Sequence, residues 1–283
     1  MNNELRTSSA HALLALVADT FQEARARWLF WGLFSLSSLL ILIFLFALQI
    51  DLAAGAISLL GVQSTVRRIF SIQKFVNVSY SWISILLYVW GTFLAIFASA
   101  GLIPSVLEAG RISLLLSKPV GRTTLLLGRY LGNLLIVSLN HIYLVGAVWL
   151  IIAAKTNIWD YRFLLAIPIS IFIFAVLLCV VVFVGVRSES AALSVMAPVA
   201  LGLISALLAQ HQIVIKLLDS EWSRQLWMVL YWIVPKVYDL GSALRQVILL
   251  DNHVDLITPI WTSSLFGLVV LIAAIHTFRK RDF

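Results

Sequence analysis

The sequence predicts an all-α integral membrane protein, and three observations support this fold class. The chain has 283 residues, of which 61% are hydrophobic and only 12% are charged. Its mean hydropathy is +1.01, which does not suit a water-exposed surface. Six apolar runs are each long enough to cross a bilayer, which takes about 20 residues per helix. We interpret residues 1–283 as one transmembrane domain, because no polar stretch could form a separate domain of about 100 residues.

The N-terminal segment, residues 9–27, has apolar side chains at helical spacing, and hydroxyl residues near its start can cap a helix. This pattern predicts an amphipathic helix on the inner leaflet that leads into the first span. Arg25 and Arg27 lie directly before that span, so the positive-inside rule favours a cytoplasmic N-terminus. With six spans, the C-terminus returns to the same side.

The six predicted spans have no charged residue at their centres. They cover residues 28–50, 81–103, 130–154, 163–186, 192–214 and 257–277. Basic residues also flank the third and sixth spans on the predicted inner side, at Lys118, Arg122, Arg129, Arg279, Lys280 and Arg281. These flanks agree with the orientation that the N-terminus predicts.

Two segments on the predicted outer side carry shorter patterns. Residues 62–77 place apolar side chains on one helical face and polar or basic ones on the other, which predicts a helix lying in the membrane interface. The apolar run 226–234 is closed by Pro235 and is too short to span, which predicts a re-entrant or interfacial helix. Tryptophans crowd this segment and several span ends, as in the aromatic belt at a water boundary.

The chain lacks the motifs of several function classes. It has no G-x-x-x-x-G-K-[ST] loop for nucleotide phosphates, no nucleophile paired with a base and no metal-ligand spacing. Its single cysteine, Cys179, excludes a disulfide framework. The spans hold no carboxylate, which ion-driven transporters usually keep at membrane depth. Asn140 and His141 of the third span are candidates to line a pathway, although interhelical hydrogen bonding is the commoner role of such residues.

The inward segment between the second and third spans contains a short predicted helix. Ser105 and Glu108 have the spacing of a capping box, in which each side chain satisfies a free amide of the first turn. Pro119 disfavours helical dihedrals at Lys118, so we expect the helix to end near Ser117. A short capped helix here suits the transmission of movement from a cytoplasmic partner. The alternative is a plain connecting loop whose basic residues only set the topology.

Residues 104–132 resemble the hallmark of the ABC-2 type transporter permeases. The resemblance rests on Glu108-x-Gly110-Arg111, on Leu114-Leu115-Leu116-Ser117-Lys118-Pro119-Val120-x-Arg122 and on Leu126-Leu127-x-Arg129-Tyr130-Leu131-Gly132. The flanking Phe21-x-Glu23-Ala24-x-Ala26-Arg27 and Phe278-Arg279-Lys280-Arg281-Asp282 are similar to segments of the same family. Within it, the chain is most similar to permeases of multi-copper enzyme maturation. Gly121 and Arg129 depart from the commoner Ser and Lys, and neither departure alters the charge or the helix break.

The resemblance implies six spans, an N-terminal elbow helix, a cytoplasmic coupling helix after the second span and short re-entrant helices before the sixth. By motif position, the residues that face the ATPase partner are Glu108, Gly110, Arg111, Leu115, Lys118, Pro119 and Arg122. The implied elbow residues are Phe21, Glu23 and Arg27. Independently, Gly128 and Gly132 form a small-xxx-small pair that is typical of close helix packing, or of simple flexibility.

The resemblance also implies partners and a location. Two permease subunits, a second copy or a sister permease, pair with two separate ATP-binding cassette subunits that hold the ATP and Mg. We therefore expect a permease of an ATP-driven exporter in a prokaryotic plasma (inner) membrane, with both termini cytoplasmic. We expect it to have no catalytic activity, no bound cofactor or metal and no nucleic-acid partner.

Other functions and cargoes remain open at this stage. One alternative function is a membrane anchor of an ABC complex with a mechanical or regulatory role. The sequence counts against a third, an intramembrane enzyme, because it lacks the necessary catalytic sets. Nearly uncharged spans fit a lipid-like or hydrophobic cargo better than a bare ion, and a cargo connected with metal-site assembly is the alternative.

Overall fold

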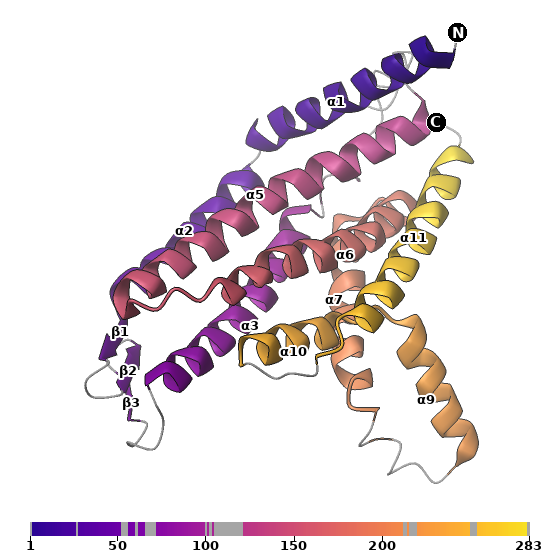
Figure 1. The fold of residues 1–283 in the computed structure, drawn as a ribbon. Helices are drawn as coiled ribbons and strands as arrows, with labels where there is room; N and C mark the ends of the chain where they lie inside the picture. The colour runs from indigo at the N-terminus through magenta and orange to yellow at the C-terminus, as the bar shows by residue number, and fades with distance from the viewer. Residues whose placement is uncertain are drawn as a thin grey trace.

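The computed structural model describes residues 2–26, 28–51, 56–59, 62–65, 72–99, 101, 104, 121–211, 214, 220–249 and 254–281. Most of these residues are helical, which confirms the predicted fold class (Figure 1). In chain order the helices are α1 (Asn2–Ala26), α2 (Trp28–Ala47), α3 (Ile72–Ser99), α5 (Arg122–Thr156), the 3₁₀ helix η2 (Tyr161–Leu165), α6 (Ala166–Ser188), α7 (Ala191–Leu208), α9 (Glu221–Ile233), α10 (Val237–Ile248) and α11 (Ile257–Arg279).

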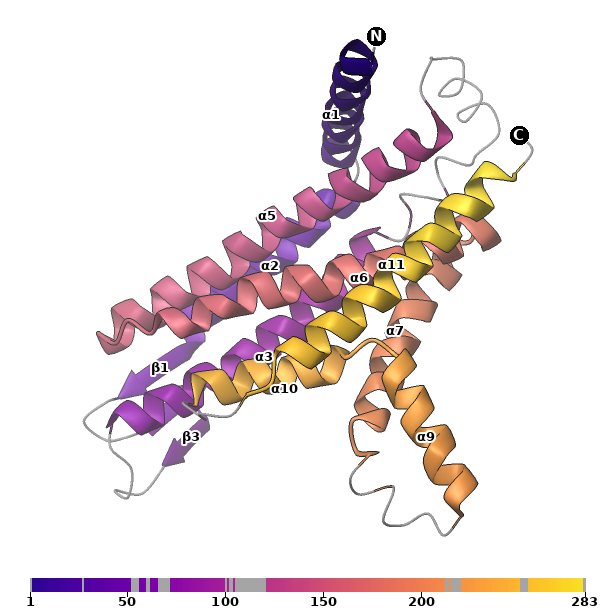
Figure 2. The same cartoon turned by 45° about the vertical axis from the view of Figure 1, so that its right-hand side comes forward.

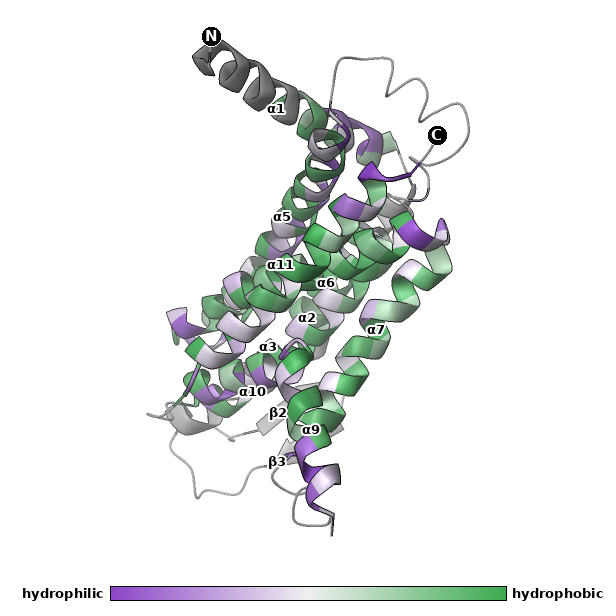
Figure 3. Cartoon of the chain, turned by 90° about the vertical axis from the view of Figure 1, so that its right-hand side faces the viewer, coloured by the Kyte–Doolittle hydropathy of each residue, from purple (hydrophilic) through white to green (hydrophobic). Residues whose placement is uncertain are grey.

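Helices lie at all six predicted spans. Within the described residues, five helical segments are long and apolar enough to cross a membrane: Val76–Ser99, Arg122–Thr156, Tyr161–Ser188, Ala191–Leu208 and Ile257–Arg279. A sixth span results if the bent pair Leu14–Ala26 and Phe30–Phe46 is counted as one. Hydrophobic residues cover the middle of the bundle, and hydrophilic ones gather at its two ends (Figure 3). The helices therefore form a multi-pass membrane bundle.

The N-terminal helix α1 lies where the elbow helix was predicted. Its C-terminal part, Leu14–Ala26, meets Phe30–Phe46 of α2 at an angle of 69°. α1 leaves the line of α2 and packs against the beginning of α5. Two views 45° apart show it lying across that end of the bundle rather than continuing along it (Figure 2). Its placement on the inner leaflet stays a prediction.

A small antiparallel sheet corrects two sequence-based boundaries. Strands β1 (Leu48–Asp51), β2 (Ala56–Leu59) and β3 (Val62–Thr65) pair in the order β1-β2-β3, with Leu48 opposite Leu59 and Leu59 opposite Val62. The first span therefore ends at Ala47 instead of residue 50, and the predicted interfacial helix 62–77 is wrong over residues 62–65, which form β3. Residues 62–65, Val-Gln-Ser-Thr, are too few for periodicity to distinguish a strand from a helix, while residues 72–77 are helical and begin α3.

The centre of the bundle is α6, which packs against α11, α7, α5 and α3. Its sequence is apolar around its whole circumference, and such a helix is stable where other helices surround it. In the most apolar stretch of the span Tyr161–Ser188, which contains α6, 67% is buried, whereas in that of α11 only 17% is buried. Most of the α11 surface therefore remains available to lipid or to another subunit.

The segment before the last span forms two helices separated by Pro235. α9 covers residues 226–233 of the predicted apolar run 226–234, and Val234 is extended because a residue preceding proline favours extended dihedrals. α9 has no buried residue and projects from the bundle (Figure 1). α10 packs against α3 and α7, and it buries Leu240, Leu244 and Ile248. One helix of the pair is thus part of the bundle and the other extends away from it.

Candidate functional site

Most residues of the predicted coupling segment lie outside the described residues. They are Glu108, Gly110, Arg111, Leu115, Lys118 and Pro119, and the elbow residue Arg27 also lies outside. Arg122, the last residue of the motif, begins α5. The part of the site that the structure describes is therefore the end of the bundle at which α1, α5 and α11 meet. We call it the arginine end, after Arg122, Arg129 and Arg281.

Arg122 connects the first turn of α5 to the end of α11. Its Nη1 donates hydrogen bonds to the carbonyl oxygens of Arg279, at 3.1 Å, and Arg281, at 2.6 Å. The last carbonyls of a helix have no partner within the helix, so a guanidinium is a favourable donor for them. Arg281 in turn donates to the Val186 carbonyl of α6 and forms an ion pair with Glu189, which follows α6. One chain of contacts thus joins α5, α11 and the α6–α7 turn.

Arg129 connects α5 to α1. Its guanidinium is almost fully buried, forms an ion pair with Glu23 and lies 3.3 Å from the carboxylate of Asp19. Glu23 is itself largely buried, whereas Asp19 is more than half exposed. A charge-assisted hydrogen bond between buried groups is stronger than one at a wet surface. The pair with Glu23 is therefore the main polar link between the two helices.

Gly128 and Gly132 allow α1 to approach α5 closely. A Cβ atom added to Gly128 would lie 2.6 Å from Cβ of Leu16, and one added to Gly132 would lie 2.6 Å from Cβ of Thr20. Both distances are shorter than two carbon atoms can tolerate. The small-xxx-small pair thus lies directly under α1. Phe21, on α1, makes an edge-to-face contact with Phe30 of α2, with ring centroids 6.2 Å apart.

Asn140 and His141 are buried in the middle of α5 and face different neighbours. The Asn140 amide exchanges hydrogen bonds with the Ser37 hydroxyl of α2, at 3.1 and 3.2 Å. His141 Nδ1 lies 3.0 Å from the Val137 carbonyl, and its ring packs on Gly91 of α3, where a Cβ would be 3.0 Å from Nε2. Asn140 thus serves helix packing, and neither residue lines the groove described next.

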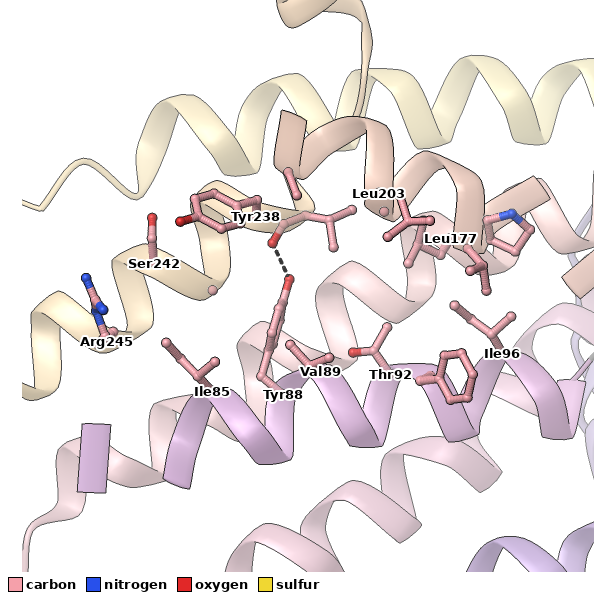
Figure 4. Close-up of a pocket in the computed structure, with 17 residues that line it drawn as sticks. Ile85, Tyr88, Val89, Thr92, Ile96, Leu177, Leu203, Tyr238, Ser242 and Arg245 are labelled. Carbon is pink, nitrogen blue, oxygen red and sulfur yellow. Dashed lines mark hydrogen bonds between the residues drawn. The ribbon is translucent and has the colours of Figure 1, made fainter. Parts of the chain in front are cut away.

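A groove that the sequence did not predict lies between α3, α7 and α10, with α6 at its base. Its volume is about 400 Å³, within the range of small-molecule sites. Most of its lining is apolar, and Tyr88 forms part of the wall by donating a 2.7 Å hydrogen bond to the Val237 carbonyl (Figure 4). Gly202 also lines it, and no atom lies within 4 Å of a Cβ built there. Arg245 and Ser242 lie toward one end of the groove and Ile96 toward the other (Figure 4).

The break between α9 and α10 holds a buried lysine. Lys236 is 3% exposed, and its Nζ donates to the Tyr231 carbonyl and lies over the Tyr231 ring. Burial lowers the pKa of Lys236 to about 8, and the nearby Asp239 carboxylate opposes this shift. Burial, followed by the charge of Asp239, raises the pKa of the Tyr231 phenol, which donates to Asp239 at 2.9 Å. The backbone amide of Lys236 donates to Ser263 Oγ of α11 at 2.9 Å.

Comparison with known protein families identifies the chain. A family model described as ABC-2 family transporter protein matches residues 14–282, nearly the whole sequence. The chain belongs to this family. No curated protein matches the sequence. The match concerns the ABC-2 family as a whole, so the similarity to multi-copper maturation permeases stays a prediction.

Membership confirms the resemblance that residues 104–132 carry. The chain is a multi-pass membrane permease subunit of an ABC transporter, and its family implies pairing with an ATP-binding cassette subunit. In this ABC-2 permease, the arginine end holds both described ends of the chain (Figure 1) and includes Arg122 and Arg129 of the motif. Among the residues that the structure describes, no group of three or more His, Cys, Asp or Glu side chains could hold a metal ion.

Sequence reasoning on the ABC-2 permease missed the groove because three separate helices form it. Its lining residues come from α3, α7 and α10, with Leu177 from α6, and these helices are far apart in the chain. One signal was available. Arg245 is the single basic residue between Val237 and Ile248, in a helix whose other face is apolar. A charged residue so placed at membrane level indicates a partner or a boundary.

Proposed function

We propose that this permease is the membrane half of an ATP-driven exporter. It works as a pair, with a second copy or a sister permease, and with two separate cassette ATPases that hold the ATP and Mg. The observation that carries the proposal is the arginine end. Within the described part of the motif, Arg122 and Arg129 tie α5 to α11 and to α1.

These contacts would transmit a movement of the coupling segment to the membrane-spanning helices. A displacement of residues 105–120 reaches α5 first, because Gly121 and Arg122 follow directly in the chain. α5 has 35 residues and, at about 1.5 Å per residue, is about 50 Å long. A rod of this length crosses the whole membrane. Because α1 and α11 are hydrogen-bonded to its first two turns, they move with it.

The orientation follows from charge. Basic residues gather at the arginine end, and the positive-inside rule favours the cytoplasmic side for such clusters. We therefore place both termini and the motif in the cytoplasm of a cell with a prokaryotic plasma (inner) membrane. The chain itself carries out no catalysis and binds no cofactor in this proposal, since the partner supplies the nucleotide site.

Copurification with mass spectrometry tests the partnership. The tagged chain, taken from its native membrane in mild detergent, is expected to bring down a stoichiometric subunit with an intact Walker ATPase motif. Glu108→Lys is expected to lower coupled ATP hydrolysis severalfold while the complex still assembles, because the motif places Glu108 against the ATPase. Glu221→Lys, a matched charge reversal on exposed α9, is the control and keeps the wild-type rate. Full hydrolysis in an assembled Glu108→Lys complex contradicts the coupling role.

Hydrolysis measured with and without cargo separates an exporter from an anchor. In an exporter, the ATPase rate of the reconstituted complex rises when extracts containing the cargo are supplied, and a component of the extract crosses the vesicle membrane. In a mechanical or regulatory anchor, hydrolysis proceeds and nothing crosses. A chain that purifies with a partner lacking any nucleotide site overturns both roles.

A further inference from the structure

Two residues that line the mostly apolar groove between α3, α7 and α10 each have a buried polar atom without a partner. Nε of Arg245 and Oγ1 of Thr92 are buried, and neither has a hydrogen-bond partner among the described residues. Thr92 is 6% exposed. Buried donors that lack a partner are costly, and an unexplained one often marks a bound group. Figure 4 shows Arg245 at one end of the groove and Thr92 on the α3 wall.

Trp82 sets the level of Arg245 in the membrane. The guanidinium carbon of Arg245 lies 5.6 Å from the centroid of the Trp82 ring, close enough for a cation–π contact. Trp82 is 61% exposed and lies six residues into the candidate span Val76–Ser99. Exposed tryptophans near span ends sit at the headgroup level. Arg245 therefore places a positive charge at the headgroup level.

The rest of the groove continues from that charge into apolar surroundings. Ile96 and Leu177 line it away from Arg245 (Figure 4), and the open face of Gly202 leaves space in the lining. One end of the groove thus suits an anion and the other a hydrocarbon chain. The molecule with both properties that is always present at this level of a membrane is an anionic lipid.

We propose that this groove binds an anionic membrane lipid, with its headgroup phosphate on Arg245 and an acyl chain packed between α3 and α7. The guanidinium offers several donors to phosphate oxygens, which gives charge complementarity and a preferred geometry. A soluble anion leaves the apolar part of the groove empty, and an uncharged hydrocarbon leaves the Arg245 guanidinium without an anionic partner. Lipid binding does not depend on the proposed export function, because it requires neither nucleotide nor cargo movement.

Lipid retention measures this directly. The full-length chain, purified with its partner, is placed in nanodiscs of equal parts phosphatidylglycerol and phosphatidylcholine with the same acyl chains. It is then extracted in mild detergent, and the retained lipid is identified by mass spectrometry without nucleotide. We expect wild type to retain phosphatidylglycerol preferentially. Arg245→Gln is expected to lower that retention about tenfold, because a charge-assisted bond is lost.

Gly202→Leu tests the acyl end of the groove. It places a side chain in the open space and is expected to reduce retention of both lipids. The matched controls are Arg224→Gln, an arginine of α9, and Gly146→Leu, where α5 also has no atom within 4 Å of a Cβ. Both are expected to behave as wild type.

Three outcomes overturn the proposal. The first is equal retention of the two lipids by wild type. The second is retention by Arg245→Gln and Gly202→Leu that matches the two controls. The third is that no lipid is recovered with the wild type while Gly202→Leu disrupts dimers. That result assigns the groove surface to a second copy of the chain.

Discussion

The arginine end and the groove differ in the contacts that hold their helices together. At the arginine end, buried or half-buried guanidiniums find carboxylates and carbonyls, and α1, α6 and α11 are tied to one another or to α5. At the groove, α3, α7 and α10 meet mostly through apolar contacts with a few hydrogen bonds, and the Arg245 guanidinium lies over the Trp82 ring rather than against a carboxylate. Directional bonds hold helices in a fixed register, whereas apolar surfaces can open. This difference is the basis of the two proposals, in which the arginine end transmits movement and the groove binds a lipid.

The largest effect is expected from breaking the buried ion pair at the arginine end. Arg129→Met removes the positive charge that the largely buried Glu23 carboxylate contacts, and losing one partner of a buried pair costs about 3–5 kcal/mol. Thermal unfolding of the purified chain in detergent measures this cost. Asp19→Asn is the control, because the exposed Asp19 contributes below about 1 kcal/mol.

A double substitution isolates the pair itself. Arg129→Met with Glu23→Leu is expected to destabilise the protein by less than the sum of the two single substitutions. Additive losses contradict a direct link between α5 and α1.

Part of the arginine end was predictable. The small-xxx-small spacing of Gly128 and Gly132 predicted close packing, because it depends on residues one turn apart. The identity of the helix that lies on them, and the pairing of Arg129 with Glu23, were not predictable. Glu23 and Arg129 are separated by 106 positions, and only the fold brings them together. From sequence, Arg129 was read as a topology signal and a motif position.

The next effect concerns the close approach of α1 and α5. Gly128→Ala places a Cβ against Leu16, and overpacking of this kind costs about 1–3 kcal/mol. Gly146→Ala is the matched control on the same helix, where nothing lies within 4 Å, and it is expected to be neutral or to stabilise by up to about 1 kcal/mol through helix propensity. Unfolding curves of the two variants measure the difference in their stability. Equal stability shows that α1 does not rest on Gly128.

The smallest effect belongs to the lysine beside the groove and depends on pH. The pKa of Lys236 is lowered to about 8 from the unfolded 10.5, so between these values the unfolded chain binds more protons and stability rises with pH. From pH 7 to pH 9 this one group adds about 1 kcal/mol. The groups that face it are Asp239 and Tyr231, and the raised pKa of the Tyr231 phenol opposes the gain only above the ordinary tyrosine pKa.

Lys236→Met removes this contribution. The difference in melting temperature between pH 7 and pH 9 is expected to shrink relative to wild type. Lys280→Met, at the exposed lysine that follows α11, controls for the loss of a lysine elsewhere. If Lys236→Met keeps the wild-type difference in melting temperature between pH 7 and pH 9, another group causes that difference.

The groove end shows where sequence reasoning stops. The apolar run before Pro235 predicted a short helix, and α9 lies there, because a proline and a length limit are local signals. The burial of Lys236 and the position of Arg245 beside Trp82 depend on how α10 packs against α3. The spacing of apolar residues along one helix does not show which other helix it packs against. The strand at residues 62–65 was misread for a related reason, since its partner at 56–59 is what distinguishes a strand from a helix of similar pattern.

Only Glu189 and Ser190 separate α6 from α7, and Glu189 adopts a left-handed conformation, with φ of 55°, that allows the chain to reverse there. Two apolar helices joined so tightly leave the ribosome as one hairpin and enter the bilayer together. α11, the most extensive partner of α6, follows only from Ile257 onward. During synthesis the α6 surface around Val176, which later contacts Gly267, is therefore exposed to whatever surrounds the nascent chain.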